Sequence, residues 1–169
     1  DLVPPAGVDN EFAQPLRDPA ARAVEELVSA AAADGVTLRI ISAYRDAATQ
    51  AALYTNYVAR DGQAAADTYS ARPGHSEHQT GLAVDFDDYG NCYLSTCFGE
   101  TAAGSWVRER AHEFGFILRY PLGSEEITGF MYEPWHFRFI GVEIAGEMHE
   151  RGIANLEDYF GLAAAPGYD

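Results

Sequence analysis

Two short segments of the sequence concentrate histidine and carboxylate side chains, the residue types that bind metal ions and transfer protons. The first, 72–85 (RPGHSEHQTGLAVD), holds His78 and Asp85. On one uninterrupted strand these two side chains would face opposite sides, because their separation is odd. Gly81 lets the chain turn between them, after which positions 82, 84 and 86 can fill a core while Ala83 and Asp85 face away. The alternative is a polar loop entering a strand, with Asp85 on the surface.

The second segment, 132–138 (YEPWHFR), places His136 and Arg138 on one face of an expected strand and the aromatic residues on the other. Pro134 cannot donate a ladder hydrogen bond and therefore marks an edge or a bulge. Such an irregularity can direct Glu133 toward the side that His136 faces. A lone histidine on a strand is usually only packed or hydrogen-bonded, but here a glutamate and a second cluster accompany it.

Together the two segments supply two neutral imidazoles and one carboxylate. His78, Asp85 and His136 form the ligand set of a catalytic zinc site with an open fourth position. A zinc ion increases the acidity of its water, and Glu133 can take the proton and pass it to a leaving amine. The sequence therefore predicts one zinc ion and a hydrolytic reaction.

Arg45 ends the segment 42–45 (SAYR), just past an expected buried strand. Its guanidinium could stabilise an oxyanion or bind a substrate carboxylate. A surface salt bridge is an equally good interpretation of an isolated arginine.

Other catalytic arrangements fit less well. His112-Glu113 resembles the start of HExxH, but position 116 is Phe. Residues 74–78 (GHSEH) lack the closing glycine of a nucleophile elbow. We expect His75, His112 and His149 to be structural or surface residues, with His75 the nearest competitor because it lies three residues from His78.

The two cysteines and the net charge indicate the type of cellular compartment and exclude some classes of binding partner. Cys92 and Cys97, flanked by turn formers, predict a disulfide-closed loop and an oxidising compartment. The net charge is −15 and all 11 basic residues are arginine, which argues against nucleic acid or an anionic membrane as a partner. No apolar stretch reaches the length of a membrane span. The chain opens at Asp1 without a basic and apolar leader, as in a mature secreted form or a shortened chain.

The elements expected around these residues indicate one α+β domain over 1–169, with 1–17 extended. Helices and strands interleave without a regular βαβ rhythm. Apolar periodicity and turn residues predict helices over 18–34, 46–58, 101–113 and 142–151, a short turn over 155–159, strands over 36–42, 82–86, 116–120 and 131–140, and a loop over 61–77.

These residues resemble the VanY-like D-alanyl-D-alanine carboxypeptidases, within the group of lysostaphin-type, D-Ala-D-Ala and hedgehog-type zinc metallopeptidases. The resemblance covers about residues 20–160. Its matching segments are SAYR with Gln50, SEHQTGLAVD at 76–85, FGFILRYP at 114–121, and Thr128-Gly129 leading to EPWH at 133–136.

The resemblance implies a small central antiparallel sheet with flanking helices and one zinc ion on His78, Asp85 and His136. It assigns the general base to Glu133 and transition-state or substrate contact to Arg45. Gln50 and Ser76 are further positions expected to contact the terminal D-alanine. Trp135 is expected to shape the wall of the substrate-binding pocket, and packing in the core explains it equally well.

The implied activity is removal of a terminal D-alanine from peptidoglycan stem peptides, outside the membrane of a bacterium and either secreted or wall-associated. A D,D-carboxypeptidase is the leading expectation; an L,D-carboxypeptidase or an endopeptidase shares the same motifs. A zinc-bearing module without catalysis would have lost its base, whereas Glu133 and Arg45 are both present. The oligomeric state is open, with a monomer as the expectation.

Overall fold

The computed structural model describes residues 1–168. Its strands are β1 (Leu2–Val3), β2 (Leu16–Arg17), β3 (Arg39–Ser42), β4 (Ala83–Asp87), β5 (Phe116–Leu118) and β6 (His136–Phe139). Its α-helices are α1 (Asp18–Ala33), α2 (Ala47–Asp61), α3 (Gln63–Ala66), α4 (Ala102–Arg110), α5 (Glu125–Thr128), α6 (Val142–Arg151) and α7 (Leu156–Phe160). Short 3-10 helices are η1 (Glu77–Thr80), η2 (Thr96–Glu100) and η3 (Ala111–Phe114).

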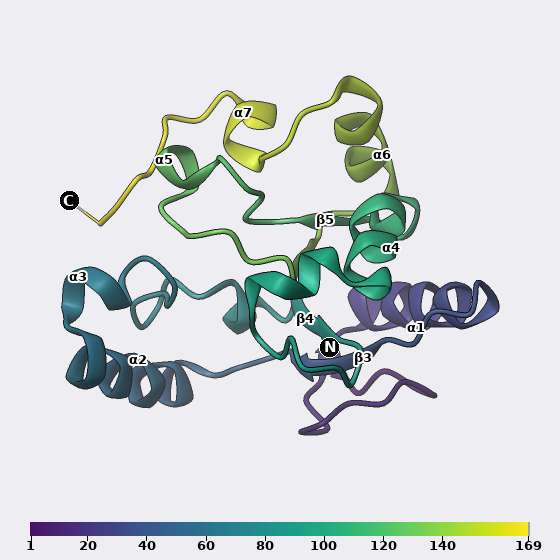
Figure 1. Cartoon of the computed structure of the whole chain (residues 1–169), viewed down its shortest axis with the longest axis horizontal. Helices are drawn as coiled ribbons and strands as arrows, with labels where there is room; N and C mark the ends of the chain where they lie inside the picture. The colour runs from purple at the N-terminus through teal and green to yellow at the C-terminus, as the bar shows by residue number, and fades with distance from the viewer. Residues whose placement is uncertain (169) are drawn as a thin grey trace.

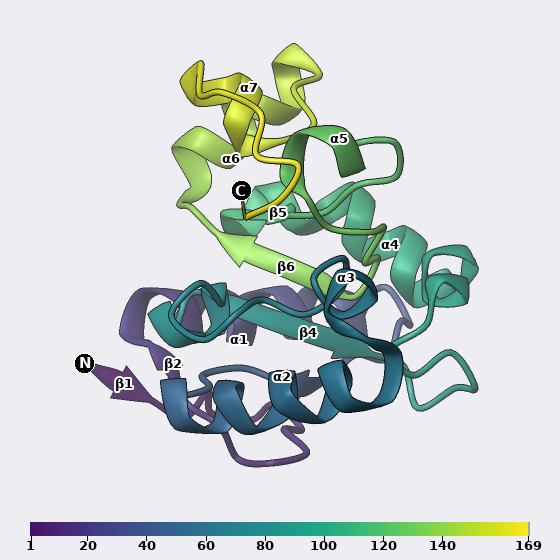
Figure 2. The same cartoon turned by 90° about the vertical axis from the view of Figure 1, so that its left-hand side faces the viewer.

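A four-stranded antiparallel sheet occupies the middle of the fold, in the order β3-β4-β6-β5. Figure 2 shows β4 and β6 running side by side in opposite directions. The register pairs Ser42 with Asp85 and Asp85 with His136. These paired residues form one line across three adjacent strands, and the line contains two of the predicted metal ligands. The expected α+β fold with a central antiparallel sheet is confirmed.

The hydrophobic core lies against one face of this sheet. Val84 and Phe86 from β4 and Phe137 from β6 are fully buried there, as the alternation along the strands predicts. Helices α1 and α4 contribute Val24, Leu27, Ala31, Ala103 and Val107 to the same cluster. In Figure 1, α1 and α4 lie on one side of β3 and β4, whereas α2 and α3 lie on the other.

The ends of α1 and α2 follow local capping chemistry. Arg17 is the N-cap of α1 and keeps an extended backbone because it pairs with Leu2 in β1. Gly35 follows the end of α1 with φ +76°, a conformation that glycine adopts without strain. Asp46 caps α2 by accepting a hydrogen bond from the Thr49 N–H at 2.7 Å.

Two predicted elements differ most from the structure. The loop over 61–77 contains the short helix α3, and the strand over 131–140 shrinks to β6. The backbone turns before His136, whose N–H donates to the Glu133 carbonyl, while the Glu133 N–H donates to the Tyr120 carbonyl. Because Pro134 has no N–H to donate, the ladder begins only at His136.

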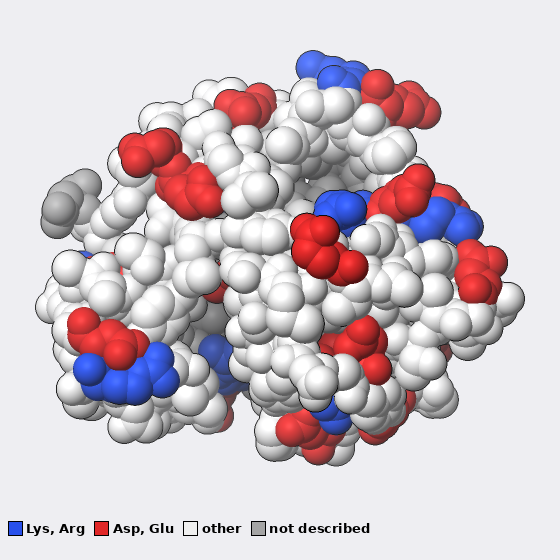
Figure 3. Space-filling model, in the orientation of Figure 1, with Lys and Arg blue, Asp and Glu red and all other residues white. Residues whose placement is uncertain are grey.

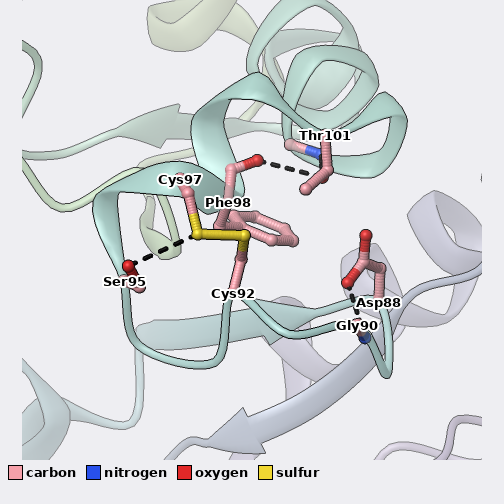
Figure 4. Close-up of a disulfide and its surroundings, with 8 residues drawn as sticks. Asp88, Gly90, Cys92, Ser95, Cys97, Phe98 and Thr101 are labelled. Carbon is pink, nitrogen blue, oxygen red and sulfur yellow. Dashed lines mark hydrogen bonds between the residues drawn. A yellow bond between two sulfur atoms is a disulfide. The ribbon is translucent and has the colours of Figure 1, made fainter.

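A disulfide closes the loop between β4 and α4. Figure 4 shows the bond between Cys92 and Cys97, with the ring of the buried Phe98 beside it. Thr101 then caps α4 by accepting a hydrogen bond from the Gly104 N–H at 3.0 Å. The predicted disulfide is therefore present, and Leu94 lies inside the loop that it closes.

Acidic groups are dispersed over the surface. On the face drawn in Figure 3, Asp and Glu side chains stand in many separate places, several of them beside arginines. The ion pairs of the structure include Arg60 with Asp61 and Arg22 with Asp18. Among residues 1–168, no helix combines the length and the apolar character that crossing a membrane requires.

Candidate active site

The three predicted metal ligands meet on the sheet face opposite the core. His78 comes from η1, Asp85 from β4 and His136 from β6, and their candidate ligand atoms all lie within 4.8 Å of one another. Gly81 ends η1 in the left-handed conformation, with φ +70°, and turns the chain into β4. The turn that the sequence required between His78 and Asp85 is therefore present, and Asp85 is buried.

Hydrogen bonds on the outer side of each histidine decide which ring nitrogen faces the cluster. The Nδ1–H of His78 donates to the Ala43 carbonyl at 2.6 Å, which leaves Nε2 facing the Asp85 carboxylate at 3.3 Å. His136 is arranged in the opposite way. Its Nδ1 faces Asp85 at 3.0 Å, and its Nε2 faces the Glu77 carboxylate at 3.4 Å.

This donor set fits zinc. Ligand atoms about 2.0–2.1 Å from a tetrahedral zinc lie roughly 3.3–3.4 Å from one another. The nitrogen-to-carboxylate distances of 3.3 Å and 3.0 Å at Asp85 are close to that spacing. Burial lowers the pKa of the His78 imidazole, which favours the neutral form that binds metal. Two imidazoles and one carboxylate also leave a fourth position open, as catalytic zinc sites do.

Glu133 lies beside the cluster. Its side chain is buried, with Oε2 4.0 Å from His136 Nδ1. Burial raises the pKa of the Glu133 carboxyl to about 8, against the opposing charges of His136 and Arg45. A carboxyl group that exchanges its proton near neutral pH can serve both as a base and as an acid.

Arg45 is held by neutral partners. Its Nη1 donates to Gln50 Oε1 at 2.8 Å and its Nη2 donates to Ser42 Oγ at 2.9 Å. Gln50 is itself buried and donates to the Ala71 carbonyl at 2.6 Å. Within the described residues 1–168, no carboxylate forms a salt bridge with Arg45, so the surface salt bridge weighed from the sequence is not what the structure shows. Two hydrogen bonds therefore hold the guanidinium of Arg45 at the wall of the cavity that the candidate ligands also line.

A single cavity of about 300 Å³ brings the predicted residues together. Its wall includes the three candidate ligands, Glu133, and the expected substrate residues Arg45, Gln50, Ser76 and Trp135. The same lining includes aromatic and apolar side chains from Tyr57, Tyr69, Leu94, Phe130 and Met131. The structure thus assembles the residues in one place, whereas their individual roles remain predictions.

The other three histidines lie apart from the cluster. The His75 ring is edge-on to Tyr168, with 5.1 Å between centroids. His112 and His149 stack on each other with 3.6 Å between centroids and border a second, separate cavity. His75, three residues from His78, therefore does not join the metal-ligand group.

Sequence reasoning assigned no role to Glu77, the residue between Ser76 and His78. In the structure its carboxylate accepts a hydrogen bond from Arg119, forms an ion pair with Arg138 and faces His136. Burial opposes its ionisation, but the hydrogen bond to His136 and the charges of the two arginines lower the Glu77 pKa to about 2. The sequence offered one indication of a role for Glu77, which is its position directly beside a predicted metal ligand. The residues that contact it lie far away along the chain, so the sequence pattern did not reveal them.

Comparison with known proteins places this geometry in a family. The family model described as VanY, D-alanyl-D-alanine carboxypeptidase, matches residues 13–142. A D-alanyl-D-alanine carboxypeptidase of Enterococcus faecalis (strain ATCC 700802 / V583) is 37% identical over 145 residues, which are 80% of this chain and 52% of the relative. The chain spans about half the length of the curated relatives that it matches.

Two solved structures show the same fold. The LdcB LD-carboxypeptidase superposes with a TM-score of 0.88 at 38% identity, covering 96% of this chain and 78% of the other. A mutant of the vancomycin resistance D,D-pentapeptidase VanY from a VanB-type cassette, in complex with Zn(II), gives a TM-score of 0.80 at 34% identity, covering 95% and 89%. Zinc in that relative and the matching donor set here support the predicted cofactor. The chain belongs to the VanY family of D-alanyl-D-alanine carboxypeptidases.

Proposed function

We propose that this chain is a zinc-dependent carboxypeptidase that removes the terminal D-alanine from peptidoglycan stem peptides ending in D-Ala-D-Ala. One observation carries the proposal: a buried His78–Asp85–His136 cluster shares its cavity with Glu133 and with an arginine that has no acidic partner among residues 1–168. A metal site, a proton acceptor and a fixed cation are the parts that hydrolysis next to a free carboxylate requires.

The chain's own residues divide the chemistry between them. Zinc held by His78, Asp85 and His136 would lower the pKa of a water molecule to about 7 and polarise the scissile carbonyl. Glu133 accepts a proton from the attacking water and returns it to the leaving D-alanine amine, so one carboxyl acts first as base and then as acid. Its raised pKa and its position beside His136 suit both steps.

Arg45 would bind the negatively charged part of the substrate. The bonds to Gln50 and Ser42 fix its guanidinium, so little side-chain entropy remains to be lost on binding. The terminal carboxylate and the oxyanion of the transition state are both suitable partners. Gln50 and Ser76 would contact the terminal D-alanine from the same wall, and Trp135 would shape the pocket.

An L,D-carboxypeptidase acting on stems that end in one D-alanine is the second candidate. The likeness to the LdcB LD-carboxypeptidase, at a TM-score of 0.88, favours it. Both reactions use the same metal, base and cation and differ in the residue that precedes the terminal D-alanine. An extracellular or wall-associated location also belongs to the proposal, supported by the Cys92–Cys97 disulfide.

The test is D-alanine release from two acylated stem peptides, one ending in D-Ala-D-Ala and the other in a single D-Ala. Zinc-loaded protein is compared with chelated protein and with Glu133→Ala. Release from the first peptide alone, lost in both controls, is the expected result. Release from the second peptide alone would select the L,D reaction. If zinc binds but neither peptide yields D-alanine, the exopeptidase proposal is wrong, and an endopeptidase assay on cross-linked stems follows.

A further inference from the structure

We propose that Glu77 is a positioning residue that orients His136 for metal binding, and that a buried group of charges anchors it. The inference rests on the zinc site of the proposed function. It concerns the side of His136 that faces away from the metal cluster. In metal sites, the outer ring nitrogen of a ligating histidine commonly donates to a carboxylate that fixes both the tautomer and the ring orientation.

The two oxygens of Glu77 have different partners. Oε1 accepts a hydrogen bond from Arg119 Nε at 2.9 Å and forms an ion pair with Arg138 Nη1, also at 2.9 Å. Oε2 remains for His136 and faces its Nε2 at 3.4 Å. The arginines therefore hold the carboxylate without occupying the oxygen that meets the histidine. A proton on Nε2 leaves the lone pair of His136 on Nδ1, the nitrogen that faces Asp85 at 3.0 Å.

Arg119 is in turn fixed from its other side. Its Nη1 and Nη2 donate to the two oxygens of Glu157 at 3.1 Å and 2.7 Å, a bidentate pair. The side chains of Arg119 and Glu157 are each 11% exposed, and that of Glu77 is 14% exposed. Two arginines and two glutamates balance in charge, so the group can be buried without a net charge.

Four separate elements contribute to this group: Glu77 begins η1, Arg119 follows β5, Arg138 lies in β6 and Glu157 lies in α7. If the group had a purely structural role, the contact with His136 would be incidental. Loss of any of the four charged residues would then lower the stability of the fold to a similar extent. A positioning role makes Glu77 distinct, because it alone of the four joins the group to a candidate ligand in the hydrogen bonds of residues 1–168.

Glu77→Gln and Glu157→Gln make a matched test, since both remove one charge from the same arginine with the same change of shape. Zinc affinity is measured by competition with a chromophoric chelator, and the ligand field by the visible spectrum of the cobalt-substituted protein. Thermal melting of the metal-free proteins verifies folding. We expect Glu77→Gln to weaken zinc binding about 10-fold and Glu77→Ala about 100-fold, with an altered cobalt spectrum. Glu157→Gln loosens the anchoring group but leaves the contact between Glu77 and His136 in place, so it should cost much less affinity than Glu77→Gln and keep the spectrum.

Wild-type zinc affinity and an unchanged cobalt spectrum in Glu77→Gln would overturn the proposal. So would an equal loss of affinity in Glu157→Gln, because that would assign the effect to the fold. If Glu77→Ala does not fold, the isosteric Glu77→Gln still decides the matter. If wild-type protein binds zinc but releases no D-alanine, the proposed function fails, while the affinity comparison still tests the role of Glu77.

Discussion

Replacing Glu133 with glutamine is expected to stabilise the metal-free protein and to abolish most of its activity. Burial raises the pKa of this carboxyl from 4.5 to about 8 in the folded protein. The folded state therefore holds a proton that the unfolded chain releases as the pH rises between these values. This contribution to the free energy of unfolding is fully present below pH 4.5 and is lost as the pH rises through 8.

The size of the effect follows from the shift. One pKa unit corresponds to about 1.4 kcal/mol. The contribution of Glu133 to the free energy of unfolding of the wild-type protein should therefore fall by about 3 kcal/mol between about pH 5 and pH 7.5. Glutamine stays neutral throughout, so the stability advantage of Glu133→Gln should grow by that amount over the same range. In the zinc-loaded enzyme, loss of the acid–base group should lower kcat by about 10²–10⁴-fold.

Denaturant unfolding of chelated protein at both pH values measures the first effect, and D-alanine release measures the second. Glu143→Gln, on the exposed surface of α6, is the control for removing one carboxylate. An advantage of equal size at both pH values would show that Glu133 is already ionised in the folded metal-free protein. Near wild-type kcat in Glu133→Gln would refute its role as the base.

Zinc binding at about pH 7 should release between one and two protons, since His136 with a pKa raised to about 10 and Glu133 with a pKa raised to about 8 both hold protons without metal. Affinity should therefore increase as the pH rises; calorimetry in buffers of different ionisation heat counts the protons, and a pH-independent affinity would contradict the pKa values. Replacing Cys92 and Cys97 together by serine should raise KM for the stem peptide with little change in kcat, because the disulfide-closed loop carries Leu94 to the cavity wall and not to the metal ligands. Steady-state kinetics checks this, and an unchanged KM would show that Leu94 does not contact substrate.

The sequence alone was enough for the features that depend on local pattern. Gly81 and Pro134 indicated where the chain leaves regular structure, and the structure turns at both places. Alternation over 82–86 and helical periodicity after residue 18 predicted β4 and α1. The four-residue helices α3 and α5 escaped prediction because one turn is too short to show a period.

The role of Glu77 escaped prediction for a different reason. Its partners Arg119 and His136 lie 42 and 59 residues away along the chain. The direction of a side chain at the start of a 3-10 turn is set by where those distant partners arrive. No spacing rule within the segment 72–85 could therefore separate Glu77 from a solvated glutamate.

The geometry of the site depends on strand register, and the register is determined by the opposite face of the same strands. Asp85 lies opposite His136, whereas their neighbours Val84 and Phe137, paired one step along, are fully buried in the core. A slip of β6 by one residue would turn Phe137 out of the core and carry His136 away from Asp85 at once. Side-chain packing of Val84, Phe86 and Phe137 thus helps to keep the two ligands opposed, in addition to the direct contact between His136 Nδ1 and the Asp85 carboxylate. A core substitution such as Phe137→Ala, which removes about 3–5 kcal/mol of stability, should on this reasoning weaken zinc binding even though Phe137 faces away from the metal cluster.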